Sequence, residues 1–377
     1  MAGRRARRRW VRLVLSGLAR LLLGSSFLIG ALGWFAAGRF LEPRRTSPNY
    51  DVRVIEVAEG RVRLERTEES EKPGVWGLEW EGGYAQVSRI FRLERSTVLR
   101  EYRPFRGTLE VGLQVSVDRW AYPGDPETAF GMAFANVDVP SALGDFPAWY
   151  VGGSRDTWVI FVHGMNASRR EALRMLPGVV DLDFPSLVVT YRNDPGAPAS
   201  PDGMLHLGET EWQDVESAAT FAVDHGAEHL VMVGFSMGGS IVAQFLQHSP
   251  SAGRVEGAIL DAPALDWEST VTLVGEGRGL PAILTSAAKA IFSIRFEEDW
   301  RNLDEVDVLD PLDVPILLFH GIADDTVPIE TSDGFAVSER DRVTYVRVPG
   351  AGHVEAWNLD RAAYGAAVRA FLVRVTK

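Results

Sequence analysis

The segment HLVMVGFSMGGSIVAQFLQ, residues 229–247, decides the fold. Its first seven residues form a continuous apolar run typical of a buried parallel strand, and residues 240–247 have the pattern of an apolar helix. Ser236 lies at the turn between them, with glycines at 234 and 238, where side chains would collide as strand and helix pack closely. The pattern predicts a serine hydroxyl exposed at the carboxyl end of a sheet.

Apolar runs of the same kind flank this segment on both sides: TWVIFVHG (157–164), SLVVTY (186–191), VEGAILDA (255–262), VPILLFHG (314–321) and RVTYVRV (342–348). Helical patterns lie between them, including an apolar stripe over 215–223 and a last helix over 359–373. Strands that alternate with helices predict an α/β fold with a doubly wound, mostly parallel sheet. We place this domain at 130–377, with a short cap around 262–312.

A serine is a weak nucleophile until a base, itself held in place by an acid, removes its proton. His353 follows the last predicted strand in a glycine-rich loop, and is our candidate base. Asp324 follows the strand before it and is our candidate acid, with Asp325 and Asp261 as alternatives. The order Ser236, Asp324, His353 is the order of the α/β-hydrolase triad.

The same chemistry needs donors for the oxyanion that forms on the attacked carbonyl. The backbone N–H of Met237 is one candidate, and that of Met165, after the strand ending at 162, is the other. His163 is then structural rather than a base, and Asn166 can add a side-chain donor. The pattern indicates neither a metal nor an organic cofactor.

Four motifs resemble the α/β-hydrolase superfamily: HGM (163–165), GFSMGG (234–239), HGIADDTVP (320–328) and GAGH (350–353). The chain from about residue 130 is similar to bacterial serine hydrolases of the serine-aminopeptidase and dienelactone-hydrolase-like groups. The resemblance implies Ser236 as nucleophile, His353 as base, Asp324 as orienting acid, and the amides of Met165 and Met237 as oxyanion donors. It implies cleavage of an ester or related acyl bond, with acyl transfer, peptide cleavage or a non-catalytic binding role on the same fold as alternatives.

Substrate-side residues are less distinct. Arg192 can meet an anionic group, although an ion pair with Asp194 is the simpler interpretation. Trp267 and Trp300 either line the entrance or fill the core. One apolar helix face in the cap either floors an acyl pocket or packs on the sheet; its residues are Leu284, Ala287, Ala288, Ile291 and Phe292.

The N-terminus differs from the rest of the 377-residue chain in charge. Residues 1–45 contain ten arginines and one acid, whereas the whole chain has a net charge of -12. The apolar stretch from Leu18 to Phe40 is long enough to span a bilayer, and the arginines before it predict an extracytoplasmic catalytic domain. A cleaved signal peptide ending near Ala36-Ala37-Gly38 is the alternative.

The remaining segment, 46–129, has short alternating runs typical of antiparallel strands, and we expect a small β layer continuous with the main sheet. The acidic body lacks the basic surface that nucleic-acid binding needs. There are no cysteines, which excludes a thiol nucleophile and disulfides. We therefore expect a small-molecule or lipid-like acyl substrate; the sequence does not indicate an oligomeric state.

Overall fold

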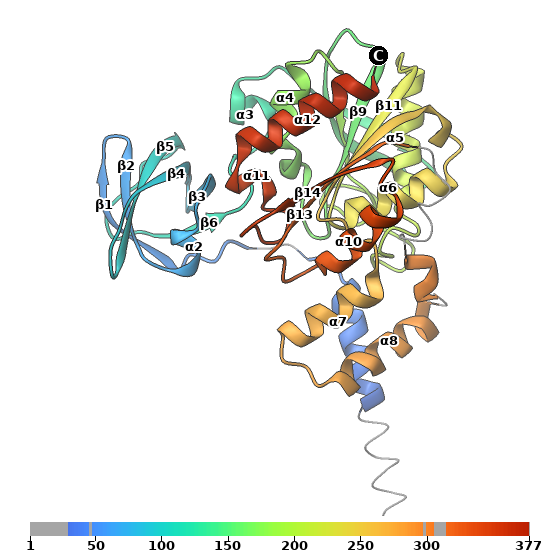
Figure 1. Cartoon of the computed structure of the whole chain (residues 1–377), viewed down its shortest axis with the longest axis horizontal. Coiled ribbons are helices and arrows are strands. Elements are labelled where there is room, and N and C mark those ends of the chain that lie inside the picture. Colours follow the sequence, from blue (N-terminus) through green and yellow to red (C-terminus); the bar gives the residue numbers. More distant parts are fainter. Residues whose placement is uncertain (1–28, 45–46, 297–298, 305–313, 377) are drawn as a thin grey trace, which may run out of the picture.

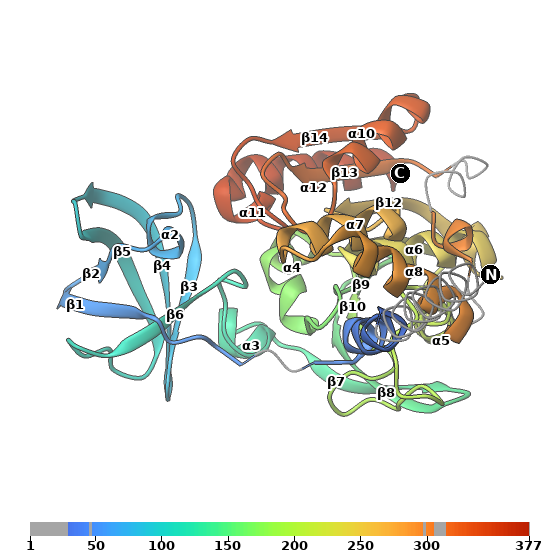
Figure 2. The ribbon, with the colours of Figure 1, turned by 90° about the horizontal axis from the view of Figure 1, so that it is seen from below.

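The computed structural model describes residues 29–44, 47–296, 299–304 and 314–376. A β-barrel lies beside the α/β domain, and a group of helices projects from the α/β domain away from the central sheet (Figure 1). The barrel and the α/β domain form adjacent lobes when the molecule is turned (Figure 2).

The central sheet has eight strands in the order β14-β13-β12-β11-β9-β10-β8-β7. The six strands β9 to β14 run parallel, whereas β8 pairs antiparallel with β10 and with β7 at one edge. Their bounds are β7 (Ala135–Ser141), β8 (Gly144–Val151), β9 (Thr157–Val162), β10 (Ser186–Val188), β11 (His229–Phe235), β12 (Val255–Asp261), β13 (Ile316–Gly321) and β14 (Val343–Val348). The predicted doubly wound, mostly parallel sheet is confirmed.

Helices cover both faces of this sheet, so each face has its own apolar cluster. In β11, Leu230 and Met232 belong to one cluster and Val231 and Val233 to the other, as strand alternation requires. The helices are α4 (Leu176–Val180), α5 (Trp212–Asp224), α6 (Met237–His248), α10 (Ile329–Ser338), α11 (Ala356–Leu359) and α12 (Arg361–Val375). A strand buried on both faces explains the continuous apolar runs of the sequence.

The segment before the sheet is a closed barrel with strand order β1-β2-β5-β4-β3-β6, so the expected β layer continuous with the main sheet is wrong. The barrel closes because β1 pairs with both β2 and β6, and its inward side chains form a separate apolar core. Its elements are β1 (Val52–Ala58), β2 (Arg61–Glu65), α2 (Glu68–Glu71), β3 (Trp76–Trp80), β4 (Gly83–Leu93), β5 (Thr97–Arg106) and β6 (Gln114–Asp118). Helix α3 (Pro126–Phe130) lies between the barrel and β7.

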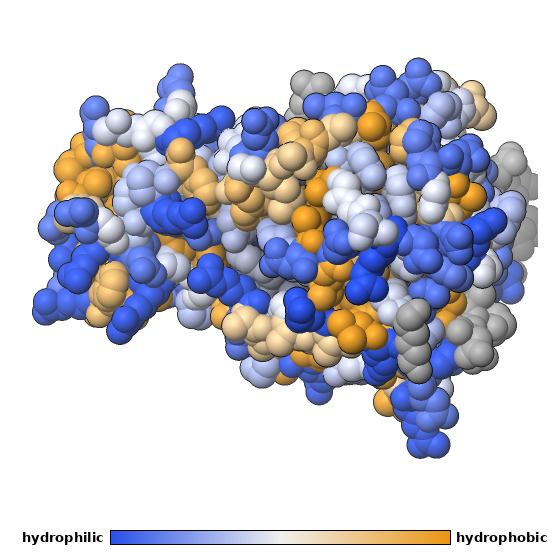
Figure 3. All heavy atoms as spheres, turned by 90° about the horizontal axis from the view of Figure 1, so that it is seen from above, coloured by the Kyte–Doolittle hydropathy of each residue, from blue (hydrophilic) through white to orange (hydrophobic). Residues whose placement is uncertain are grey.

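On the outside of the barrel lobe, hydrophilic side chains alternate with apolar patches (Figure 3). Strand alternation points every second side chain outward, and a few of these outward side chains, such as Phe91 and Leu93, are apolar. The outward side chains include many arginines and glutamates that pair with one another, such as Arg63 with Glu56 and Glu94.

The cap consists of α7 (Trp267–Gly277) and α8 (Ala282–Phe296), and residues 29–41 form a further helix beside them (Figure 1). That helix packs closely on α8, since a Cβ added to Gly33 would lie 3.1 Å from the Ala287 carbonyl carbon. Of the predicted span Leu18–Phe40, residues 18–28 lie outside the described residues. Across the parts of the chain that the structure describes, no helix combines the length and the apolarity needed to cross a membrane.

Candidate active site

Ser236 lies at the tip of the turn between β11 and α6, as the sequence predicts. Its backbone angles are φ 50° and ψ -118°, a strained conformation that exposes the side chain at the carboxyl end of the sheet. Close packing permits the turn only with glycine nearby: a Cβ on Gly238 would lie 2.2 Å from the Val162 carbonyl oxygen. The strained turn thus holds the serine at a fixed point above β9 and β11.

The structure brings the three candidate residues together, although they lie in loops after three different strands. The His353 Nε2 atom is 2.8 Å from the Ser236 Oγ, and its Nδ1 atom is 2.8 Å from Asp324 Oδ2. If Nδ1 carries the proton and donates to the carboxylate, Nε2 has a free lone pair that accepts the serine hydroxyl. This is the arrangement that a general base requires.

The Asp324 side chain is fully buried, and its two oxygens accept several hydrogen bonds. One oxygen accepts from the backbone N–H groups of Thr326 and Val327, at 2.8 and 2.9 Å. Burial alone would raise the pKa of Asp324, but hydrogen bonds from His320, His353 and the backbone lower it below its usual value. Asp324 is therefore an anion at any pH where His353 can act as a base.

His320 is a further partner of Asp324, beyond the residues predicted from the sequence. Its Nε2 atom lies 3.3 Å from Asp324 Oδ2, and its Nδ1 atom lies 2.7 Å from the Ser332 hydroxyl. The ring is fully buried and contacts the same carboxylate oxygen as His353, so it helps to orient the acid. The four-residue spacing between His320 and Asp324 across a strand end was the available signal.

The two alternative acids do not reach His353. Asp325 is exposed, and the Asp261 side chain instead accepts a hydrogen bond from the Tyr364 hydroxyl at 3.0 Å. Burial raises the pKa of Asp261 to about 6, and its other carboxylate oxygen has no hydrogen-bond partner among the described residues. The backbone of Asp261 stabilises the turn at Ser236, since the Asp261 carbonyl accepts a hydrogen bond from the Ser236 N–H at 3.0 Å.

The two candidate oxyanion donors flank the serine. Met237 is the first residue of α6, so its N–H has no acceptor within the helix, and Met165 lies on the wall of the same pocket as Ser236. The preceding N–H, that of Gly164, donates to buried Glu171 at 2.7 Å and fixes the loop. The sequence S-R-R-E (168–171) has the pattern of a helix capping box, but Ser168 makes no side-chain cap hydrogen bond and the Glu171 carboxylate turns toward Gly164 instead.

Asn166 lines the same pocket as Ser236. Its side-chain oxygen accepts a hydrogen bond from the Arg44 backbone N–H at 2.6 Å. The segment that follows helix 29–41 is thereby attached to the loop that carries Met165. A second backbone bond, from Leu205 N–H to the Leu41 carbonyl at 3.0 Å, attaches the end of the helix itself.

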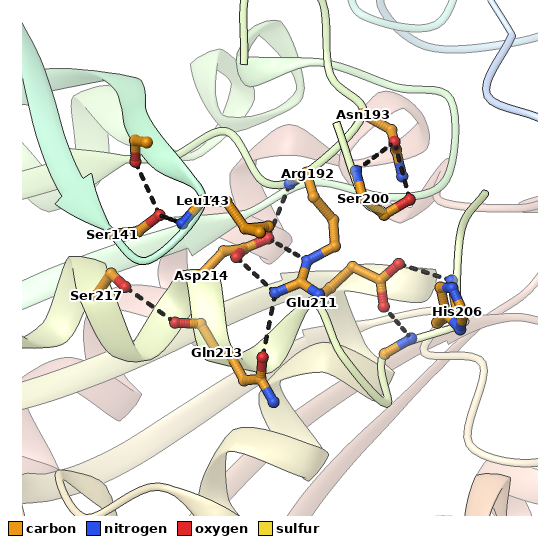
Figure 4. A network of polar contacts seen from close by, with 12 residues as sticks. Ser141, Leu143, Arg192, Asn193, Ser200, His206, Glu211, Gln213, Asp214 and Ser217 are labelled. Carbon is orange, nitrogen blue, oxygen red and sulfur yellow. Dashed lines mark hydrogen bonds and ion pairs between the residues drawn. The ribbon is translucent and has the colours of Figure 1, made fainter. Parts of the chain in front are cut away.

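His163 has the structural role that the sequence predicts, and its Nε2 atom lies 2.7 Å from Asp194. Burial opposes its protonation, but Asp194 raises the pKa of His163 above the ordinary value. The expected ion pair between Arg192 and Asp194 is wrong. Arg192 instead binds both oxygens of Asp214 at 2.8 Å, in a network that also includes Gln213 (Figure 4).

A pocket of 510 Å³ opens over Ser236 and His353, and four parts of the chain line it. Glu79, Asp118 and Trp120 come from the barrel side, Phe40 and residues 47–49 from the N-terminal segment, and Trp267 from the cap. The barrel is held here by Arg170, which pairs with Asp118 at 2.7 Å, and by Arg119, which donates to the His353 carbonyl at 3.2 Å. No local sequence pattern predicts this contribution of the barrel.

Trp267 is also buried in the core, where its indole N–H donates to the Ser240 hydroxyl in α6 at 3.0 Å. Within the described ranges, no group of three or more histidine, aspartate or glutamate side chains is arranged to hold a metal ion.

Two family models match parts of the chain. Residues 153–300 match the family described as serine aminopeptidase, S33, and residues 53–118, which coincide with the barrel, match a domain of unknown function. An uncharacterised protein of Salmonella typhimurium, YfhR, is 23% identical over 214 residues. That alignment covers 53% of this chain and 65% of the relative, so it spans less than two thirds of the relative's length.

Solved structures share the fold. An esterase of Pyrococcus furiosus superposes with a TM-score of 0.56 at 18% identity, covering 68% of this chain and 96% of that chain. The DcsB protein, solved in complex with its substrate analogue, has a TM-score of 0.50 at 13% identity, covering 64% of this chain and 99% of that chain. With the match over 153–300, these likenesses support an enzyme of the α/β-hydrolase fold and of serine hydrolase type.

Proposed function

We propose that this protein hydrolyses a carboxylic ester through Ser236, His353 and Asp324. The observation that carries the proposal is the unbroken chain of two 2.8 Å contacts from Ser236 through His353 to Asp324. The serine lies on a strained turn, the acid is buried and anionic, and the pocket above them is open to a substrate.

The reaction follows from this geometry. Ser236 Oγ attacks the ester carbonyl while His353 Nε2 takes its proton, and the N–H groups of Met165 and Met237 stabilise the resulting oxyanion. His353 then gives the proton to the departing alcohol, leaving the acyl group on Ser236. Water, deprotonated by His353, attacks this acyl-enzyme and releases the carboxylic acid. Asp324 stays ionised and stabilises the imidazolium at both stages.

A fluorophosphonate probe tests the nucleophile directly, because it labels only an activated serine. We expect the full chain to be labelled and to hydrolyse short p-nitrophenyl esters, and the Ser236→Ala variant to do neither. Unchanged labelling of Ser236→Ala would contradict the assignment. A folded wild-type protein that neither reacts with the probe nor cleaves any ester would favour a non-catalytic binding role.

We also propose that residues 1–45 tether the protein to a membrane with the catalytic domain outside the cytoplasm. Support comes from the arginine-rich start and the apolar stretch that follows it. Fractionation of cells that express the full chain tests this: we expect it in the membrane pellet after a high-salt wash and sensitive to protease added from outside. A soluble, shortened product would instead indicate signal cleavage.

A further inference from the structure

A second cavity, of 320 Å³, lies between helix 29–41 and the two cap helices. Its walls are mainly apolar, and they include Leu32, Phe35, Leu280, Leu284, Ala288 and Phe292. Of the four cationic residues at its edge, Arg39 and Lys289 pair with Glu42 and Glu268 at 2.6 and 2.9 Å, Arg44 donates to the Arg39 carbonyl, and Arg278 is exposed. An apolar ligand therefore fits this cavity better than a charged one.

This cavity adjoins the catalytic pocket. Phe40 and Val274 line both of them, so these two side chains form the boundary between the cavities. The Phe40 ring packs edge-on against Trp267, with 6.2 Å between ring centroids. A ligand that passes this boundary extends from the reacting carbonyl at Ser236 into the apolar cavity.

The outer end of the cavity has apolar side chains exposed to solvent. Leu32 is 45% exposed, Phe35 67% and Leu280 41%. A cluster of large exposed apolar side chains at one mouth marks a contact site for an apolar ligand or surface.

We propose that this cavity receives the long acyl chain of the ester substrate, and that helix 29–41 is a specificity wall of the enzyme. The inference rests on the proposed ester hydrolysis and adds the substrate class: esters with medium to long acyl chains. The carbonyl carbon lies at Ser236, the chain passes Phe40 and Val274, and its distal methylenes contact Ala288 and Phe292. Each methylene that leaves water contributes about 0.8 kcal/mol to binding.

The test is the dependence of kcat/KM on acyl length, measured on the full chain with p-nitrophenyl esters from acetate to dodecanoate. Ala288→Phe fills the cavity wall, and Ala290→Phe places the same bulk on the exposed face of α8. We expect wild type and Ala290→Phe to prefer dodecanoate to butyrate. Ala288→Phe should lower the dodecanoate-to-butyrate ratio by about 10-fold or more, because it excludes several methylenes.

A second measurement tests binding in the cavity directly, without turnover and with a different substitution. The Ser236→Ala variant should bind a fluorescent dodecanoyl probe, and adding Leu284→Trp to it should weaken that binding without changing the thermal melt. The inference would be overturned if Ala288→Phe and Ala290→Phe had the same acyl preference and if Leu284→Trp left probe binding to Ser236→Ala unchanged. Ester hydrolysis itself would remain intact. Absence of hydrolysis for every ester, with normal probe binding, would overturn the proposed function but not the acyl cavity.

Discussion

At the scale of single residues, His320 shows how the acid of the triad is held. Its ring is buried between Ser332 and Asp324, so replacing it removes a hydrogen bond to the carboxylate and leaves a buried serine unpaired. We expect His320→Leu to lower kcat about 10-fold with little change in KM, because the substrate does not contact this ring.

His320→Gln is the informative companion, because an amide can still donate to Asp324 and should restore part of kcat. His229→Leu, which removes a half-exposed ring at the start of β11, controls for loss of an imidazole. Steady-state kinetics of the three variants give the kcat and KM values that test this prediction. A rise in KM alone for His320→Leu would show that the residue acts on substrate binding instead.

Asp261 gives a prediction about stability. Burial raises its pKa to about 6, above the roughly 3.9 expected in the unfolded chain, so the folded state binds this proton more tightly. The stability this residue contributes is complete below pH 4 and is lost as pH rises through 6. Asp261→Asn, which cannot ionise, should therefore stabilise the protein at pH 8 by up to about 3 kcal/mol and have little effect near pH 4.

Urea denaturation at the two pH values measures this difference in the free energy of unfolding. The Tyr364 hydroxyl can still donate to the asparagine oxygen, so the variant keeps the hydrogen bond seen at 3.0 Å. An identical effect of Asp261→Asn at pH 4 and pH 8 would mean that the carboxyl does not titrate between them.

At the scale of elements, the short 3-10 helix η1 (Arg169–Arg174) joins the loops on either side of the serine. Glu171 accepts from Gly164 N–H at 2.7 Å, beside the candidate oxyanion donor Met165. Arg174 donates to the Val354 carbonyl at 2.7 Å, directly after His353. One turn of helix therefore fixes both the oxyanion loop and the histidine loop.

We expect Glu171→Ala to lower kcat by about 10-fold or more and also to lower the melting temperature, because it frees the Gly164 N–H and removes the carboxylate 3.5 Å from Arg174. Glu171→Gln keeps an acceptor for the Gly164 N–H, so its kcat and its melting temperature should both fall less. Kinetics and thermal melts of the pair test this. Full activity in Glu171→Ala would show that the loop holds its position without the carboxylate.

Elements and residues differ in how far the sequence alone predicts them. The turn at Ser236 and the loops of Asp324 and His353 follow from local patterns at strand ends, and so they could be predicted. His320 and Glu171 could not be assigned in the same way, because the short spacings to their partners Asp324 and Gly164 lead to contact only through the particular shape of the loop between them. Glu171 illustrates this: the local pattern favours a helix cap, but the unpaired N–H of Gly164 competes for the same carboxylate.

At the scale of the whole molecule, the barrel is the part that the sequence predicts least well. Period-two alternation identifies strands with one buried face, but it is the same for a sheet extension and for a closed barrel. Closure depends on pairing between β1 and β6, about 60 residues apart, which no local pattern encodes. For the same reason the sequence does not reveal that Asp118, at the end of β6, lines the catalytic pocket.

The contact between the barrel and the catalytic domain provides a last prediction. Asp118 accepts hydrogen bonds from Arg170 and from the Tyr84 hydroxyl, both at 2.7 Å. Replacing it with alanine leaves a largely buried guanidinium without its carboxylate, which should cost about 1–3 kcal/mol. Because the barrel lines the pocket, we expect Asp118→Ala to raise KM several-fold. Relative to wild type, hydrogen exchange should become faster in β6 and stay unchanged in β11.

Glu110→Ala is the matched control, since Glu110 is an exposed acid of the same barrel. It should leave both KM and the exchange of β6 unchanged. If Asp118→Ala matched it in both measurements, the barrel would be held by other contacts, of which the best placed is buried Asn358. Its side-chain amide donates to the Val75 and Arg119 carbonyls, each at 2.8 Å, so Asn358→Ala would then be expected to release the barrel where Asp118→Ala does not.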